Sequence, residues 1–218
     1  MKEKSGKLWI ISKSTHWVAI EKPAGWLTTP SRLGAEDERP CLGRELEREL
    51  GCRVWPVHRL DQEVSGLVLF ALSADAHRAL SGAFEGRSVR KHYHARCELR
   101  PEARVTEGKL ERWESRMLRG KRRAYVDPRG KECVTEARVV RVEGAVVELE
   151  LWPLTGRPHQ LRVECAQHGM PILGDVLYGA QERTEEGIAL RAVSLDFSDW
   201  PEHGRWELPE QLTSASDG

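Results

Sequence analysis

The sequence predicts a mixed fold in which many strands are combined with three helices. Short apolar or alternating segments recur along the whole chain and are separated by turn-forming residues, a pattern typical of strands. Three other segments have the spacing or the end signals of helices. No repeat and no linker divides the 218 residues into independent parts, so we expect one domain.

The expected strands extend from the beginning of the chain almost to its end. They are residues 8–11, 17–20, 66–72, 91–97, 133–142, 145–154 and 188–197. The first two form a hairpin-like opening, and residues 133–154 form an antiparallel meander that turns at Glu143-Gly144. Alternation places Tyr93, Ala95 and Cys97 on one face of their strand, so Tyr93 is expected to point inward.

The three helices are predicted from spacing and from end signals. Leucines at 42, 46 and 50 recur every four residues, and Gly51 ends this helix. Ser73 can cap a second helix that continues to about Gly86. Its apolar face consists of Ala76, Leu80 and Phe84. The third helix opens at residues 155–158, with Pro158 near its first position, and closes at Gly169, so Arg162 lies in its first turns.

The composition indicates a soluble cytoplasmic protein. Apolar residues make up 39% and charged residues 31%, and no segment approaches the roughly 18 apolar residues of a membrane span. The first residues contain only a short apolar run, which is too short for a signal peptide. Five cysteines form no CxxC motif. Cys165 and His168 have the spacing of metal ligands but lack a second pair, so we expect no metal and no disulfide framework.

Basic residues are concentrated in one part of the chain. Lys and Arg together number 34, as do Asp and Glu, but residues 86–131 contain fifteen basic and six acidic side chains. Such a run is usually a solvated face, although it would also suit a polyanionic partner. Residues 116–123 are too basic and too Gly-interrupted for a core element and are expected to form a loop or the arms of a hairpin. Arg119, Lys121 and Arg122 are candidates for phosphate contacts.

A carboxylate stands at the entrance of the strand predicted over residues 66–72. The polar turn His58-Arg59-Leu60-Asp61 leads within a few residues into this apolar run. An ionised Asp beside a buried strand is costly unless a cation pairs with it, so we interpret this segment as a site. Taken singly, Asp61 could be a turn residue, Tyr93 a core residue and Arg162 a surface charge on a helix.

Several motifs surround these three residues in a fixed order. They are Glu21-Lys22-Pro23-Ala24-Gly25; His58-Arg59-Leu60-Asp61 with Ser65-Gly66; Tyr93; Thr155-Gly156-Arg157-Pro158-His159-Gln160-Leu161-Arg162-Val163; and Gly169-x-Pro171-Ile172-x-Gly174-Asp175-x-x-Tyr178-Gly179. This series resembles the RluA family of RNA pseudouridine synthases over nearly the whole chain. The chain is similar to the compact members, which lack an appended N-terminal RNA-binding module of the S4 type. Val64, Glu164 and Pro158 depart from the usual family residues but are none of the three chemical residues.

The resemblance implies the fold in more detail. We expect a single α+β catalytic domain over residues 1–212, followed by a disordered tail over residues 213–218. Its central sheet should be mixed and mostly antiparallel and flanked by helices and loops. An active-site cleft containing Asp61 should cross the sheet.

The resemblance also implies an activity, the conversion of uridine to pseudouridine within RNA without a cofactor. Asp61 would be the essential carboxylate, which either adds covalently to the substrate or removes a sugar proton. Arg162 would hold Asp61 ionised and oriented. Tyr93 would stack on the base and help to remove the proton at carbon 5.

RNA binding is assigned to the turn beside Asp61 as well as to the basic segment. The target nucleotide must be flipped out of its stack, and Arg59, next to His58, is expected to fill the space it leaves. Arg59 could instead only pair with a nearby acid. Compact relatives act on transfer RNA, on large-subunit ribosomal RNA or on both, and we expect a monomer.

The sequence is also compatible with a second function. The same fold and the same basic surface would serve a non-catalytic RNA-binding or ribosome-assembly factor. What favours an enzyme is the set of Asp61, Tyr93 and Arg162, because chemistry requires these residues and binding alone does not.

Overall fold

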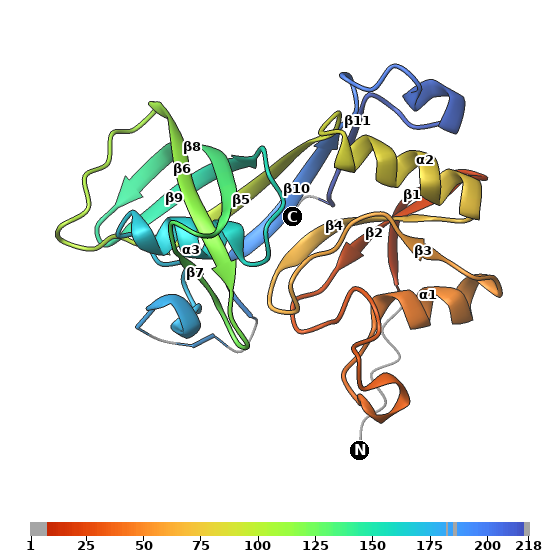
Figure 1. Cartoon of the computed structure of the whole chain (residues 1–218), viewed down its shortest axis with the longest axis horizontal. Coiled ribbons are helices and arrows are strands. Elements are labelled where there is room, and N and C mark those ends of the chain that lie inside the picture. Colours follow the sequence, from red (N-terminus) through yellow and green to blue (C-terminus); the bar gives the residue numbers. More distant parts are fainter. Residues whose placement is uncertain (1–7, 182, 185–186, 216–218) are drawn as a thin grey trace.

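A large mixed sheet runs through the whole molecule (Figure 1). The computed structural model describes residues 8–181, 183–184 and 187–215. The strands are β1 (Trp9–Lys13), β2 (Trp17–Lys22), β3 (Trp55–Pro56), β4 (Ser65–Ala71), β5 (Arg90–Glu98), β6 (Leu110–Arg119), β7 (Ala124–Val126), β8 (Lys131–Glu143), β9 (Val146–Pro153), β10 (Leu190–Asp196) and β11 (Gln211–Thr213). The α-helices are α1 (Leu42–Leu50), α2 (Ala74–Glu85) and α3 (Gln160–Gln167), and short 3-10 helices are η1 (Gly34–Glu36), η2 (Val176–Tyr178) and η3 (His203–Trp206).

The strand order confirms the expected mixed, mostly antiparallel sheet. It is β1-β2-β4-β10-β5-β9-β8-β6-β7, with β3 paired to β4 and β11 paired to β10. Within the part of the chain that the structure describes, β4 and β10 run parallel and the other named strand pairs are antiparallel. Because β10 comes late in the chain but lies beside β4 and β5, it joins the two halves of the sheet.

The half formed by β1–β4 is covered on both faces, which explains its continuous apolar strands. Every residue of β2 is buried, as are six of the seven residues of β4. Val18 and Ile20 pack in one hydrophobic cluster with Leu42 and Leu46 of α1. The opposite face, with Ala19, packs against α2 in a second cluster. A strand buried on both sides carries apolar residues at consecutive positions rather than at alternate ones.

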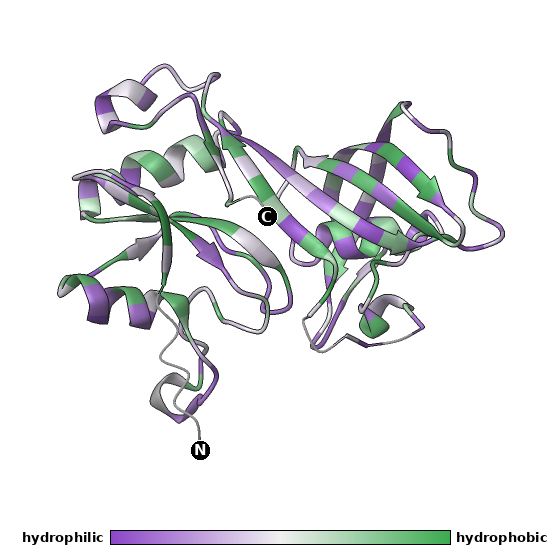
Figure 2. Cartoon of the chain, turned by 180° about the vertical axis from the view of Figure 1, so that it is seen from behind, coloured by the Kyte–Doolittle hydropathy of each residue, from purple (hydrophilic) through white to green (hydrophobic). Residues whose placement is uncertain are grey.

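The half formed by β5–β9 shows the alternating pattern of strands with one buried face. Hydrophobic and hydrophilic residues follow one another along these strands (Figure 2), and β9 alternates strictly between buried and half-buried residues. α3 lies against this half (Figure 1). All residues of α3 from Gln160 to Cys165 are buried, so this helix has no solvent-facing stripe along most of its length.

Most local predictions are confirmed, with small differences at element ends. Gly51 ends α1 in the left-handed conformation, and the Ser73 hydroxyl accepts a hydrogen bond from the Ala76 amide at the start of α2. α3 begins at Gln160, two residues after Pro158, because His159 has a left-handed backbone with φ of 57°. The basic residues 116–123 form the end of β6 and the turn that leads to β7 at Ala124, so they belong to a hairpin, one of the two expected possibilities.

The C-terminal end of the described chain belongs to the sheet. β11 contains Thr213, the first residue of the segment predicted as a tail, and the Ser214 amide donates a hydrogen bond to the Val193 carbonyl. Residues 216–218 lie outside the described residues. No helix among the described residues is long and apolar enough to cross a membrane.

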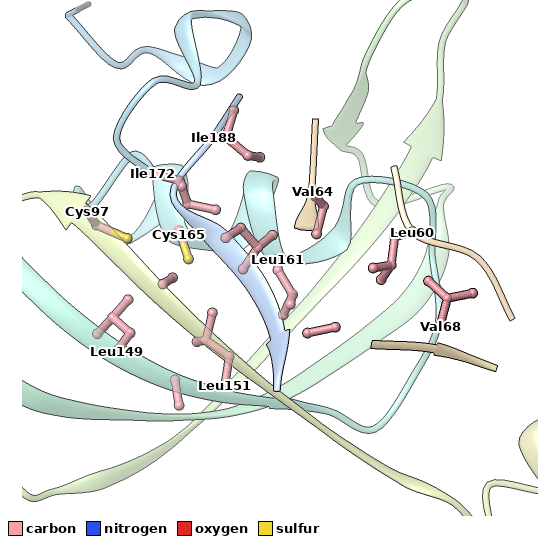
Figure 3. Close-up of a cluster of buried hydrophobic side chains, with 14 of the residues drawn as sticks. Leu60, Val64, Val68, Cys97, Leu149, Leu151, Leu161, Cys165, Ile172 and Ile188 are labelled. Carbon is pink, nitrogen blue, oxygen red and sulfur yellow. The ribbon is translucent and has the colours of Figure 1, made fainter. Parts of the chain in front are cut away.

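One hydrophobic cluster holds the Asp61 segment against the α3 helix. Leu60 and Val64, on either side of Asp61, are buried in the same cluster as Leu161, the neighbour of Arg162 (Figure 3). Leu149 and Leu151 of β9 belong to the same cluster (Figure 3). Apolar packing therefore sets the distance between the segment that carries Asp61 and the helix that carries Arg162.

Gly66 offers a test of the contact between the two halves. It has φ of 111°, and a Cβ atom at this position would lie 2.2 Å from the Ala192 carbonyl oxygen on β10. Gly66→Ala is therefore expected to lower the free energy of unfolding by more than about 2 kcal/mol in urea denaturation. Gly82→Ala, inside α2 with open space around it, is the matched control and should raise it by about 0.5–1 kcal/mol. Equal effects of the two changes would contradict this account.

Candidate active site

An open cleft of about 1100 Å³ is lined by residues from both halves of the sheet. Of the residues predicted to form the site, it contains His58, Arg59, Asp61, Tyr93 and Arg162. The expected cleft around Asp61 is thus present. Arg119, Lys121 and Arg122 do not line it.

Asp61 is presented by a backbone segment that is fixed on both sides. The hydroxyl of Thr28 donates to the Leu60 carbonyl at 3.1 Å and accepts from the Leu60 amide at 3.2 Å. The Val64 amide donates to the Asp61 carbonyl, which closes a turn at the entrance of β4. The carboxylate of Asp61 remains 31% exposed. The backbone is therefore fixed while the carboxylate faces the cleft.

Arg162 is a buried cation whose principal partner is Asp175. Its side chain is 2% exposed, and its Nε and Nη2 donate to the two carboxylate oxygens of Asp175 at 2.7 and 2.8 Å. The expected ion pair with Asp61 is present but longer, with 3.6 Å between Arg162 Nη1 and Asp61 Oδ2. Nη1 also donates to Glu63 at 3.2 Å. Burial opposes the charged form, but these three carboxylates together raise the pKa of Arg162.

This arrangement orients Asp61 without saturating its carboxylate. The bidentate pair with Asp175 fixes the plane of the Arg162 guanidinium. At 3.6 Å, Asp61 receives the electrostatic attraction of Arg162 but no hydrogen bond from it. Asp61 is consequently held as an anion whose oxygens remain available to a molecule in the cleft.

A second buried cation, Lys22, binds the backbone of the segment that carries Asp61. Lys22 is fully buried, and its ammonium donates to the carbonyls of Pro23, Trp26 and Gln62, which uses its three donors. Burial lowers the pKa of Lys22 to about 8, against the opposing charges of Glu63 and Asp61. Lys22 thereby fastens the first sequence motif to the backbone next to Asp61.

His159 points a ring nitrogen toward Asp61. Its Nε2 lies 4.0 Å from Asp61 Oδ2, and its Nδ1 lies 2.8 Å from the hydroxyl of Tyr178. The Ala124 amide donates to this hydroxyl, so Tyr178 can give its own proton to Nδ1. Burial lowers the pKa of His159, which favours the neutral ring. In that state the remaining proton is on Nε2 and faces Asp61.

Tyr93 forms the inner wall of the cleft beside Asp61. It shares a face of β5 with Ala95 and Cys97, as predicted, and packs against the main hydrophobic cluster. Burial, with a smaller contribution from the charge of Asp61, raises the pKa of Tyr93, so its phenol is neutral at physiological pH. Its ring is a surface on which a planar base can stack.

The two residues before Leu60 lie in different surroundings. The ring of His58 stacks on Phe84 with 5.0 Å between the ring centroids, and its Nε2 accepts a hydrogen bond from the Leu69 amide. Burial, with a contribution from Lys91, lowers the pKa of His58 to about 3. Arg59 is exposed at the cleft, and no ion pair among the described residues includes it.

The basic β6–β7 hairpin lies next to the cleft rather than inside it. Lys121 and Arg122 are exposed in its turn. The positive charge of Arg119, at the end of β6, contributes to the lowered pKa of His159. The bond from Ala124 of β7 to Tyr178 connects the hairpin to the groups around Asp61.

The pair considered for a metal, Cys165 and His168, is accounted for by packing. Cys165 is buried in the main hydrophobic cluster, and the ring of His168 stacks on Trp113 with 4.1 Å between centroids. The described residues contain no group of three or more His, Cys, Asp or Glu side chains placed to hold a metal ion.

Comparisons with known proteins place the chain in a family. A family model described as RNA pseudouridylate synthase matches residues 16–167. The chain therefore belongs to the RNA pseudouridylate synthase family, whose members are isomerases.

Two of its relatives illustrate the range of named activities. The dual-specificity RNA pseudouridine synthase RluA of Pasteurella multocida is 36% identical over 194 residues, which cover 86% of this chain and 85% of that protein. The tRNA pseudouridine synthase C of Salmonella typhimurium is 36% identical over 197 residues, which cover 83% and 74% of the two chains.

Solved structures support the fold. Human RNA pseudouridylate synthase domain containing 1 superposes on this chain with a TM-score of 0.71 at 22% identity. The superposition covers all of this chain and 94% of the human chain. Human RNA pseudouridylate synthase domain containing 4 has a TM-score of 0.70 at 22% identity and covers 96% and 88% of the two chains. The fold predicted from the motifs is thus confirmed.

Sequence reasoning assigns no chemistry to several residues that the structure brings to the site. They are Lys22, Glu63, Lys91, His159, Asp175 and Tyr178. Four of them stand inside the motifs that carry the family resemblance, so motif membership is the signal that could have identified them. For Glu63 and Lys91, the only signal in the sequence is that they stand two residues from Asp61 and from Tyr93, respectively.

Glu164 stands out as a buried acid on the far side of α3. It is 2% exposed, and the Thr135 hydroxyl donates to one of its oxygens. Gln160 donates to Thr135 and to the Val134 carbonyl, so this group links α3 to β8. Burial raises the pKa of Glu164 to about 7, against the hydrogen bonds that favour its charge. The folded protein consequently favours the protonated acid.

Glu164→Gln tests this assignment through stability. Below a pH of about 4.5 the acid is protonated in both the folded and the unfolded state. Between pH 4.5 and about 7 it ionises more readily in the unfolded chain, which lowers the free energy of unfolding of the native protein. This loss of stability is complete above about pH 7. At pH 8 the variant is expected to gain up to about 3 kcal/mol in free energy of unfolding over the native protein, and little at pH 4. Urea denaturation across this pH range measures it, with the exposed Glu49→Gln as control. A gain independent of pH would show that the pKa of Glu164 is the same in the folded and the unfolded protein.

Proposed function

We propose that this chain isomerises specific uridines to pseudouridine within folded RNA and that Asp61 is the essential carboxylate. The observation that carries the proposal is the position of Asp61, whose carboxylate faces the cleft between buried Arg162 and Tyr93. A protein that only binds RNA has no need for a carboxylate in its cleft, since carboxylates repel phosphates.

The reaction requires the glycosidic bond between N1 and the sugar to break, the uracil to rotate, and carbon 5 to bond to the same sugar carbon. Asp61 either adds covalently to the substrate or removes a proton from the sugar, and both routes need it ionised before the reaction starts. The guanidinium of Arg162 lies 3.6 Å from this carboxylate and attracts it electrostatically. The proton lost from carbon 5 balances the proton that N1 gains.

Tyr93 and His159 have different tasks beside this carboxylate. Tyr93 stacks on the uracil during its rotation. Because burial keeps its phenol neutral, its oxygen can receive the carbon-5 proton only as the hydroxyl passes its own proton to a neighbouring acceptor. His159, held by Tyr178, offers its Nε2 proton to Asp61 and limits the movement of the carboxylate.

The target uridine reaches these groups after it has flipped out of its stack. Arg59, exposed at the cleft, occupies the vacated space, and His58 beside it completes this part of the RNA-binding surface. The hairpin residues Arg119, Lys121 and Arg122 bind phosphates next to the cleft.

The substrate is structured RNA, either transfer RNA, large-subunit ribosomal RNA or both. The relatives named above include a dual-specificity synthase and a tRNA synthase, which supports this choice. The protein acts as a cytoplasmic monomer without a metal or an organic cofactor.

Asp61→Asn is expected to abolish pseudouridine formation, a loss of at least about 1000-fold, because the amide can neither add to the substrate nor accept a proton. Transcripts of transfer and ribosomal RNA labelled with tritium at carbon 5 release the label into water when the isomer forms. RNA affinity should change less than about threefold. Asp75→Asn, at an exposed ion pair with Arg78, is the control and should retain full activity. Substantial release by Asp61→Asn would contradict the assignment of Asp61 as the essential carboxylate. No release by the native protein on any transcript would point to a protein that only binds RNA.

Charge reversal at Arg119, Lys121 and Arg122 tests the hairpin. Each lost phosphate contact should lower the slope of log affinity against log salt by about 0.7–0.9. Affinity is measured by filter binding between low and moderate salt. Reversal of the exposed Arg48, Arg53 and Arg78, none of which lines the cleft, is the matched control. An unchanged slope in the hairpin variant would place RNA elsewhere on the surface.

A further inference from the structure

The cleft contains a half-buried cation that the proposed catalytic steps do not use. Lys91 lies on β5, two residues before Tyr93, and lines the same cleft. Its ammonium donates to the Thr155 carbonyl at 3.3 Å, a long hydrogen bond. An ammonium has three donors, and the structure shows an acceptor for one of them.

No carboxylate offsets the charge of Lys91. None of the ion pairs between described residues includes it, in contrast to the three carboxylates around Arg162. The charged or titratable groups that act on it are Arg87, which follows α2, and the ring of His58, which is itself affected by the charge of Lys91. Burial, with a smaller contribution from Arg87, lowers the pKa of Lys91 to about 8.

Such a lysine is costly to the free protein and is expected to have a ligand. Enclosing a cation without a counter-ion destabilises the fold, and a neutral side chain of the same length would avoid this cost. Gly156 lies beside the amine, since a Cβ there would make ordinary van der Waals contact with Nζ at 3.8 Å. Arg59, Arg90 and Arg157 also line the cleft, and its acidic lining residues are Asp61 and Glu85, so basic side chains outnumber acidic ones around an anion placed here.

The strand register indicates which anion fits. Residues two apart in a strand point to the same face and are roughly 6.6 Å apart along it. Lys91 is thus one such step from Tyr93, where the proposed function places the flipped uracil. The nearest negative group of an RNA bound in this way is the phosphate of the flipped nucleotide itself.

We propose that Lys91 binds the 5′-phosphate of the flipped target nucleotide and so anchors its backbone while the uracil moves. This inference rests on the proposed function, because it takes the position of the base on Tyr93 from it. Lys91 is a binding residue in this account, and it takes no part in the chemical step.

The first test uses two variants and measures RNA affinity. Lys91→Met should weaken binding about tenfold and lower the salt slope by about 0.7–0.9, and Lys91→Arg should preserve both. The native affinity should fall as pH rises above about 8, where Lys91 loses its proton, whereas Lys91→Arg should not show this fall. Lys109→Met, at an exposed lysine paired with Glu111 outside the cleft, is the matched control. If Lys91→Met does not fold, the pH dependence of RNA affinity in the native protein and in Lys91→Arg still tests the proposal.

The second test identifies the phosphate. A neutral methylphosphonate replaces the 5′-phosphate of the target uridine in an RNA that the native protein modifies. It should weaken binding to the native protein about tenfold and have little additional effect on Lys91→Met. Equal losses in both proteins, or an unchanged salt slope in Lys91→Met, would overturn the proposal. Tritium release by the native protein reports separately on the proposed function, so the two can fail independently.

Discussion

The site depends on one buried cation, Arg162, which interacts with three carboxylates from two segments of the chain. Asp175 takes two of its donors in a bidentate pair, Glu63 takes a third, and Asp61 lies within electrostatic reach. A buried guanidinium would be unstable without these partners. The same pairs also join the segment before β4, the α3 helix and the turn before η2. Stability of the fold and orientation of Asp61 thus come from the same contacts.

The carboxylates of Asp175 and Asp61 lie at unequal distances from the Arg162 guanidinium, and this difference leaves Asp61 available for chemistry. The partner that holds Arg162 in place is Asp175, which is buried and cannot meet a substrate. Asp61 is more distant and partly exposed, and Nε2 of His159 lies 4.0 Å from the same oxygen, Oδ2, that faces Arg162. A carboxylate in such a position is oriented but retains oxygens that can react. Strong pairing of Asp61 itself would have occupied the oxygens that the proposed reaction needs.

Hydrophobic packing defines the geometry in which these charges act. Leu60 and Val64 on one side and Leu161 on the other enter a single cluster with β9 (Figure 3). Close packing transmits small changes in volume, so the separation between Asp61 and Arg162 is set by apolar side chains that do no chemistry. The cost of ionisable groups inside this core is visible in Glu164, Lys22 and Lys91, whose pKa values are all displaced toward the neutral form by burial.

The sequence by itself determined the family, the strands and helices, and the candidates Asp61, Tyr93 and Arg162, because apolar periodicity, turn residues and ordered motifs are local properties of the chain. Only the tertiary structure decided which residues meet. It paired Arg162 with Asp175 rather than mainly with Asp61, placed His58 against Phe84, and brought Lys91 into the cleft. A lysine in an alternating strand looks like an ordinary surface charge. Its environment follows from the packing of α2 and the residues after β9 around it, which no local pattern encodes.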